Sequence, residues 1–230
     1  MISKRQQEIL HIIIEHYIKD ALPIASSFLA QRVIGKVSSA TVRNELVLLE
    51  NDGYIFQPHT SSGRVPAEKA YRFYIDNNLN KEKELGRINR EKIKKIIFGE
   101  DNCRNKLKTL AKTIAEISNQ AVIVAFEEND NYYTGLANLF SQPEFEKNRI
   151  ISLSAIVDHL DRVLEKLFAR ENKNTEILLA GENPFGIDCG AIIGNYKFDS
   201  FQGIIAIVGP LRMNYQENYI LINETIKLLS

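Results

Sequence analysis

The sequence predicts an α+β protein in two parts: an N-terminal winged helix-turn-helix domain, then an α+β domain with a mainly antiparallel sheet. Three observations predict it. Residues 1–80 contain three helical segments followed by two short strand signals around a polar turn. Residues 81–103 form a basic, lysine-rich stretch that reads as a linker or helix. Residues 104–230 combine helical periodicity with several apolar runs of strand length.

The first two helices are marked by serine and proline. Ser3 is followed three positions later by glutamine, a possible capping box, and apolar residues then recur at helical spacing. This helix should end before Pro23. Ser26 or Ser27 can cap a short second helix, and Gly35 then supplies a turn.

The third helix has a serine start and a glycine end. Ser38 or Ser39 can cap it, it runs to about Asp52, and Gly53 suits the left-handed position that often follows a helix. A short helix, a turn and a longer helix form the outline of a helix-turn-helix. The candidate buried positions are Val42, Leu46, Leu48 and Leu49.

The start of this third helix has the chemistry of a base-reading surface. About 14 residues give roughly 20 Å of helix, enough to lie in a DNA major groove with its N-terminal residues facing the base edges. Small residues permit close approach, arginine can pair with guanine, asparagine with adenine, and a threonine methyl can touch thymine. The predicted DNA-binding residues here are Ser38, Ser39, Thr41, Arg43 and Asn44.

A hairpin follows the third helix and predicts a wing. A short strand signal over Tyr54–Pro58 leads into a polar turn with glycine and a second short strand. We expect Arg64 at the tip of this wing, where it could reach a phosphate or the minor groove. An isolated loop histidine such as His59 is more typical of polar surface than of a ligand. A three-helix unit with a hairpin can also be a protein-interaction module, and spacing alone leaves that alternative open.

The second half predicts helices around a sheet. The expected helices cover about 107–117, 150–169 and Tyr215–Leu229. Ala121–Phe126 is a continuous apolar run that suits a buried strand. Further strand signals lie at Thr175–Ala180, Ala191–Tyr196 and Gly203–Val208.

Charge and cysteine content exclude several protein classes. The chain has 29 basic and 29 acidic residues, so it is not uniformly basic like a histone. Residues 81–125 carry a net charge of +5 and residues 126–230 a net charge of −6, which hints at one polyanion-binding part. The 81–108 stretch can equally be a solvated helix surface. Two cysteines fit a reduced cytoplasm, and the apolar runs are too short to span a membrane.

No set of residues predicts catalysis, a metal or a cofactor. Asp158, His159 and Asp161 do not share one helix face. The Gly181–Gly186 segment lacks the spacing of a phosphate loop or dinucleotide fingerprint and reads as a turn. Cys189 has no evident histidine or asparagine partner, so the sequence does not predict an enzyme.

The sequence resembles the heat-inducible transcription repressor family HrcA. The resemblance covers nearly all of residues 1–80, most specifically QPHTSSGRVP at Gln57–Pro66 and VSSATVRNE at Val37–Glu45. In the second half it continues in pieces, among them Gln142–Phe145, Gly181–Asn183 and Gly209–Tyr215.

The resemblance implies a repressor of chaperone operons with a GAF-like domain over residues 104–230. It also implies a homodimer that binds double-stranded DNA at an inverted-repeat operator and depends on the GroE chaperonin. The residues from Ser39 to Asn44 would read bases and Arg64 would serve the wing. The alternative is a ligand-sensing regulator that uses the GAF-like domain.

The chain departs from the family in one place. The family usually places a dimerising segment inside the GAF-like domain, after the first core strand. Here Phe126 is followed almost at once by the next strand signal at Asn131, which leaves no room for that segment. The chain therefore resembles a shortened member whose dimer contact is open.

Overall fold

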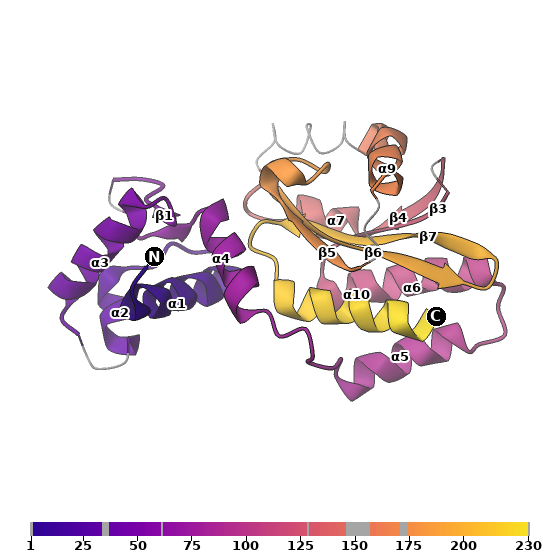
Figure 1. The fold of residues 1–230 in the computed structure, drawn as a ribbon, viewed down its shortest axis with the longest axis horizontal. Coiled ribbons are helices and arrows are strands. Elements are labelled where there is room, and N and C mark those ends of the chain that lie inside the picture. Colours follow the sequence, from indigo (N-terminus) through magenta and orange to yellow (C-terminus); the bar gives the residue numbers. More distant parts are fainter. Residues whose placement is uncertain are drawn as a thin grey trace. The chain divides into compact units, whose positions relative to one another are not determined.

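A computed structural model describes residues 2–33, 37–60, 62–127, 129–145, 157–170 and 174–229. The chain forms two compact units, Met1–Leu79 and Asn80–Ser230 (Figure 1). The turn predicted at Gly35 lies outside the described residues.

The first helix, α1 (Lys4–Asp20), begins with the predicted capping box. The Ser3 hydroxyl accepts the Gln6 N–H at 3.2 Å, and the Gln6 side-chain oxygen accepts the Ser3 N–H at 2.7 Å. The helix ends at Ala21, which has the left-handed φ of 54° and lies two residues before Pro23. Both predicted boundaries are confirmed.

The second helix, α2 (Ser26–Arg32), begins at Ser26, whereas a cap at Ser26 would place its first residue at Ser27. Its N-cap is Ala25, so the prediction that Ser26 or Ser27 caps it is wrong. The reason is non-local. Ile24 exchanges two backbone hydrogen bonds with Arg64, at 3.0 and 2.9 Å, which hold the chain extended up to Ala25.

The third helix, α3 (Ser39–Asn51), has Ser38 as its N-cap and is followed by Gly53 at φ 75°, as predicted. It buries one narrow stripe against the core of the unit: Val42, Leu46 and Leu49. Leu48 was expected among the buried positions, but it lies outside this stripe and is 50% exposed.

The predicted wing is a two-stranded antiparallel hairpin. Strands β1 (Ile55–Phe56) and β2 (Val65–Pro66) pair, with Ile55 opposite Pro66. The fourth helix, α4 (Glu68–Asn78), follows directly and buries Tyr71 in the core. The first unit is therefore a helix-turn-helix with a hairpin beside its third helix.

The second unit contains an antiparallel sheet of five strands among the described residues, in the order β4-β3-β7-β6-β5. The strands are β3 (Ala121–Glu127), β4 (Asp130–Thr134), β5 (Glu176–Leu179), β6 (Cys189–Phe198) and β7 (Phe201–Pro210). The helices are α5 (Arg87–Ile97), α6 (Cys103–Ser118), α7 (Leu136–Phe140), α9 (Leu160–Phe168) and α10 (Tyr215–Leu229). These elements confirm the predicted strands and the helices expected over about 107–117 and Tyr215–Leu229. The helix expected over 150–169 is confirmed only in part, because α9 begins at Leu160 after a turn at His159, and residues 150–156 lie outside the described residues.

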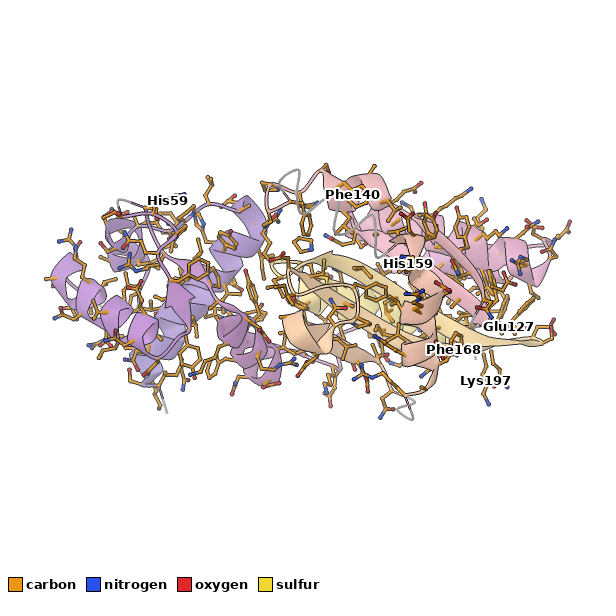
Figure 2. All side chains as sticks on the ribbon, turned by 90° about the horizontal axis from the view of Figure 1, so that it is seen from above. His59, Glu127, Phe140, His159, Phe168 and Lys197 are labelled. Atoms are coloured by element: carbon orange, nitrogen blue, oxygen red, sulfur yellow. The ribbon has the colours of Figure 1, made fainter. Side chains whose placement is uncertain are left out.

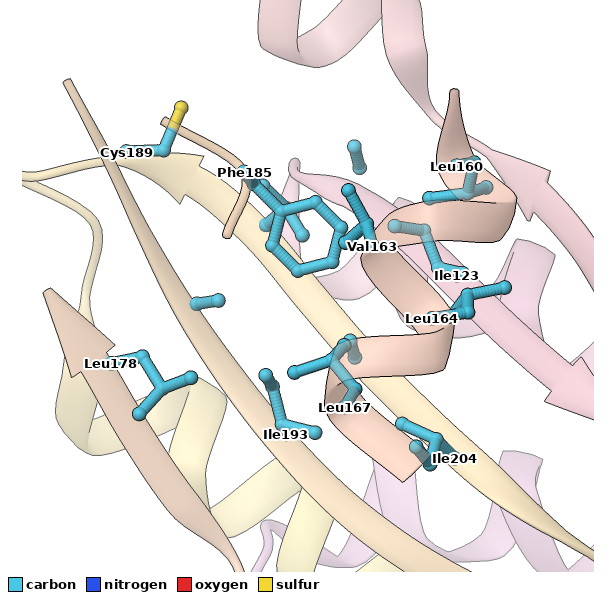
Figure 3. Close-up of a cluster of buried hydrophobic side chains, with 14 of the residues drawn as sticks. Ile123, Leu160, Val163, Leu164, Leu167, Leu178, Phe185, Cys189, Ile193 and Ile204 are labelled. Carbon is cyan, nitrogen blue, oxygen red and sulfur yellow. The ribbon is translucent and has the colours of Figure 1, made fainter. Parts of the chain in front are cut away.

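Helices cover both faces of this sheet (Figure 1). Helices α6 and α10 pack on one face, and α7 and α9 lie over the other. Because successive strand residues point to opposite faces, a strand covered on both sides is apolar on both, as β3 is from Ala121 to Phe126. Figure 3 shows Val163, Leu164 and Leu167 of α9 against Ile193 and Ile204 of the sheet.

The basic stretch expected as a linker or helix, residues 81–103, includes α5, and α5 contacts α6 and α10. The chain enters the second unit at Asn80, which exchanges two hydrogen bonds with Gln216 at 2.7 and 2.9 Å. Lys83 pairs with Glu217 at 2.6 Å. Across the described residues, no helix is both long enough and apolar enough to cross a lipid bilayer.

Candidate nucleic-acid interface

The predicted base-reading residues begin with a pair of hydroxyl groups at the start of α3. The Ser38 hydroxyl accepts the Thr41 N–H at 3.1 Å, and the two side-chain oxygens lie 3.0 Å apart. Ser38 is exposed, and Ser39 and Thr41 are half-buried. The helix therefore presents a small, polar N-terminus whose first turn is fixed by its own cap.

Arg43 and Asn44 lie one turn further along α3, and both are exposed. The Arg43 Nε donates to the Ser26 hydroxyl at 3.4 Å, which orients the arginine along the start of α2. This contact uses Nε, whereas the terminal nitrogens are the donors that form a bidentate pair with guanine O6 and N7. The Arg43 side chain thus links α3 to the first residue of α2 and leaves its terminal nitrogens for a base.

Arg64 does not lie at the tip of the wing, contrary to the prediction. It directly precedes β2, and its Nη2 and Nε lie 2.9 and 3.1 Å from one carboxylate oxygen of Glu50 in α3. The ion pair draws the side chain toward α3, so that only 19% of it is exposed. Together with the backbone bridge to Ile24, it ties the base of the wing to α3 and to the segment that leads into α2.

The loop between β1 and β2 is braced by its own polar side chains. Ser62 accepts the His59 N–H at 3.0 Å and donates to the His59 carbonyl at 2.8 Å. The Gln57 amide donates to the carbonyls of Thr60 and Ser62, both at 2.9 Å. His59 is an exposed residue of this loop (Figure 2). Throughout the described ranges, no group of three histidine, cysteine or acidic residues could hold a metal ion.

A concave surface lies between α2, α3 and the wing. Its lining residues are Ile24, Ala25, Ser26, Arg43, Leu46, Val47, Ser62, Gly63 and Arg64. Sequence reasoning predicted Arg43 and Arg64 here but missed Ser26 and Val47. The available signal for Val47 was its spacing, since a residue four positions after Arg43 shares its helix face.

The Ser38 cap gives a stability prediction. Changing Ser38 to alanine removes the acceptor of the Thr41 N–H, and we expect a loss of about 1 kcal/mol in the free energy of unfolding of the first unit. Urea denaturation of the full chain, followed by hydrogen exchange of α3, measures it. Ser38→Asn keeps a capping acceptor and should be close to the parent; an equal loss in both variants contradicts the capping role.

The second unit contains a buried thiol and an apolar pocket among its described residues. Cys189 is buried, and its burial and the nearby Asp188 raise the pKa of the thiol to about 12. A thiol that remains protonated at neutral pH is a poor nucleophile. An apolar pocket lies on the α9 side of the sheet, lined by Ala121, Ile123, Tyr133, Leu136, Leu139, Val157, Leu160, Phe185 and Val208.

Comparison with known proteins shows a similarity to the HrcA family. The family model described as the HrcA protein C terminal domain matches residues 74–218. A heat-inducible transcription repressor HrcA of Brevibacillus brevis is 41% identical over 128 residues, which cover 54% of this chain and 36% of that protein. The HrcA of Chlorobium limicola is 35% identical over 162 residues, covering 67% and 41%. The matches thus span well under half the length of these relatives.

A solved structure shares the fold. The crystal structure of a hypothetical protein matches with a TM-score of 0.82 and 18% identity, over 100% of this chain and 98% of that one. This likeness supports the whole predicted arrangement, a winged helical unit followed by an α+β unit with an antiparallel sheet.

Proposed function

The chain belongs to the HrcA family, and from this premise we propose that it is a sequence-specific, DNA-binding transcription repressor. The observation that carries the proposal is the outer face of α3. There Arg43 and Asn44 are exposed directly beyond a small, capped N-terminus, with the wing alongside. These are the residue types that distinguish base pairs in the major groove.

In this proposal α3 enters the major groove with its first turns against the base edges. Its 13 residues give roughly 20 Å of helix. Arg43 pairs with guanine, Asn44 with adenine, and the Thr41 methyl contacts thymine, while Ser38 and Ser39 permit close approach. The positive N-terminal end of the helix adds an attraction for phosphate.

Arg64 supports the wing in this proposal. Its ion pair with Glu50 fixes the base of the hairpin relative to α3, so that both elements meet the DNA as one rigid surface. The guanidinium nitrogen that faces away from Glu50 is the group proposed to contact a phosphate or the minor groove.

The family resemblance also supports partners for this chain. We propose a cytoplasmic homodimer that binds an inverted-repeat operator of chaperone genes and depends on the GroE chaperonin. Strand β3 ends at Glu127 and β4 begins at Asp130, which favours a dimer contact elsewhere than in a segment inserted at this point.

Sedimentation of the full chain with and without duplex DNA tests the proposal. The probe is the duplex that the chain enriches from a random-sequence library. We expect an inverted repeat, two chains per duplex, half-site centres about 34 Å apart or a multiple of that, and affinity that falls steeply with salt. Equal affinity for the enriched and random duplexes contradicts the proposal.

A second candidate function is ligand sensing by the second unit, whose apolar pocket has a volume of about 30 Å³ and admits only a very small ligand without movement of its lining side chains. A thermal-shift screen of apolar metabolites separates the two functions. A ligand at 100 times its dissociation constant stabilises the folded chain by roughly 2.7 kcal/mol. If the screen gives no shift, ligand sensing loses its support and the DNA-binding proposal is unaffected.

A further inference from the structure

An apolar side chain lies unexpectedly on the polar outer face of α3. Val47 is 48% exposed, and it follows Arg43 by four positions and Asn44 by three. Residues at these spacings are neighbours on a helix surface. Val47 is therefore part of the same face as the two side chains proposed to read bases.

The surroundings of Val47 differ from those of Leu48, the other large apolar residue exposed on this helix. Val47 lines the concave surface together with Ser26, Arg43 and the wing residues 62–64. Leu48 is equally exposed, at 50%, but it is not part of that lining. If the concave surface meets DNA, Val47 is covered by the bases next to those that Arg43 reaches.

We propose that Val47 is a specificity-determining residue that recognises the C5-methyl group of a thymine in each half-site. This inference rests on the proposed function, and it names one base that the proposed DNA-binding surface reads. In the major groove the thymine methyl is the apolar feature among the base edges. A β-branched valine holds its methyl groups in one preferred rotamer on a helix, so it loses little freedom on binding and fits a methyl at a fixed place.

Thymine-to-uracil replacement tests the inference, because it removes the methyl group and keeps base pairing. The probe is again the duplex that the full chain enriches from a random library, with one thymine per half-site replaced in turn. Loss of a buried methyl contact corresponds to about fourfold in affinity per half-site. Besides the thymine that Thr41 contacts, we expect a second thymine position at which uracil weakens binding by the parent chain about fourfold per half-site.

The matched variants are Val47→Ala and Leu48→Ala. Val47→Ala should lose about the same factor on the thymine duplex and show no further loss at the uracil position. Leu48→Ala should bind the thymine duplex as the parent does and keep the full uracil effect. Both are surface changes that should leave the thermal unfolding of the chain close to the parent.

Three results overturn the inference. The first is a parent chain that binds every uracil duplex as well as the thymine duplex. The second is that every uracil effect seen with the parent chain persists in Val47→Ala, or that the effect lost in Val47→Ala is lost in Leu48→Ala as well. In both cases specific binding itself stands, so the proposed function survives. A parent chain that enriches no sequence overturns the proposed function and this inference with it.

Discussion

Replacing Arg43 with alanine should weaken binding to the enriched duplex by about 1–3 kcal/mol, a factor of about 5 to 150. The reason is that the terminal guanidinium nitrogens supply a bidentate contact that alanine cannot replace. Binding to random duplex should change far less, because that binding depends on summed phosphate contacts. Filter binding or fluorescence anisotropy at fixed salt measures both affinities.

Lys19→Ala is the control for this variant, since it also removes one positive charge from an exposed position of the first unit. We expect a small, sequence-independent effect from it. Arg43→Lys should recover little of the specific affinity, because an ammonium group lacks the planar fork of donors. If Arg43→Ala lowers the affinities for enriched and random duplex by the same factor, Arg43 is a phosphate contact and does not read a base.

Replacing Gly63 with alanine should loosen the wing from the helix-turn-helix. A Cβ at this position would lie 2.3 Å from the Ile24 carbonyl oxygen and 2.7 Å from the Ile24 nitrogen. To relieve the clash, the strand must move and break the two backbone hydrogen bonds between Ile24 and Arg64. Overpacking and the loss of these hydrogen bonds should together lower the free energy of unfolding of the first unit by about 2–5 kcal/mol.

Hydrogen exchange of the full chain measures this effect, with loss of protection expected in β2 and around Ile24. Specific DNA affinity should fall at the same time, because wing and α3 no longer form one surface. Gly181→Ala is the matched control, since a Cβ there meets no atom within 4 Å among the described residues. Unchanged protection in Gly63→Ala would show that the wing does not depend on this close approach.

The sequence predicted those features of the fold that depend on neighbouring residues. The Ser3 capping box, the Ser38 cap and the left-handed Gly53 all act within one helical turn, and all three are confirmed. The strands of the second unit were also predicted, because a sheet covered on both faces requires continuous apolar runs such as Ala121–Phe126.

Predictions from the sequence were wrong where contacts between residues distant along the chain decide the geometry. The start of α2 is set by the bridge from Ile24 to Arg64, 40 positions away, and no local pattern contains it. Arg64 was predicted at the wing tip, but its ion pair with Glu50, 14 positions earlier, draws the side chain toward α3. The exposure of Leu48 follows from which stripe of α3 meets the core.

We propose that the start of α3 reads base pairs in the major groove. Dimethyl sulfate probing of guanine N7 in the enriched duplex tests it most directly, because this atom lies in the major groove. We predict one cluster of protected guanines in each half-site under the parent chain, with protection of at least one guanine lost in Arg43→Ala. Full reactivity of every guanine in a saturated complex would contradict the claim.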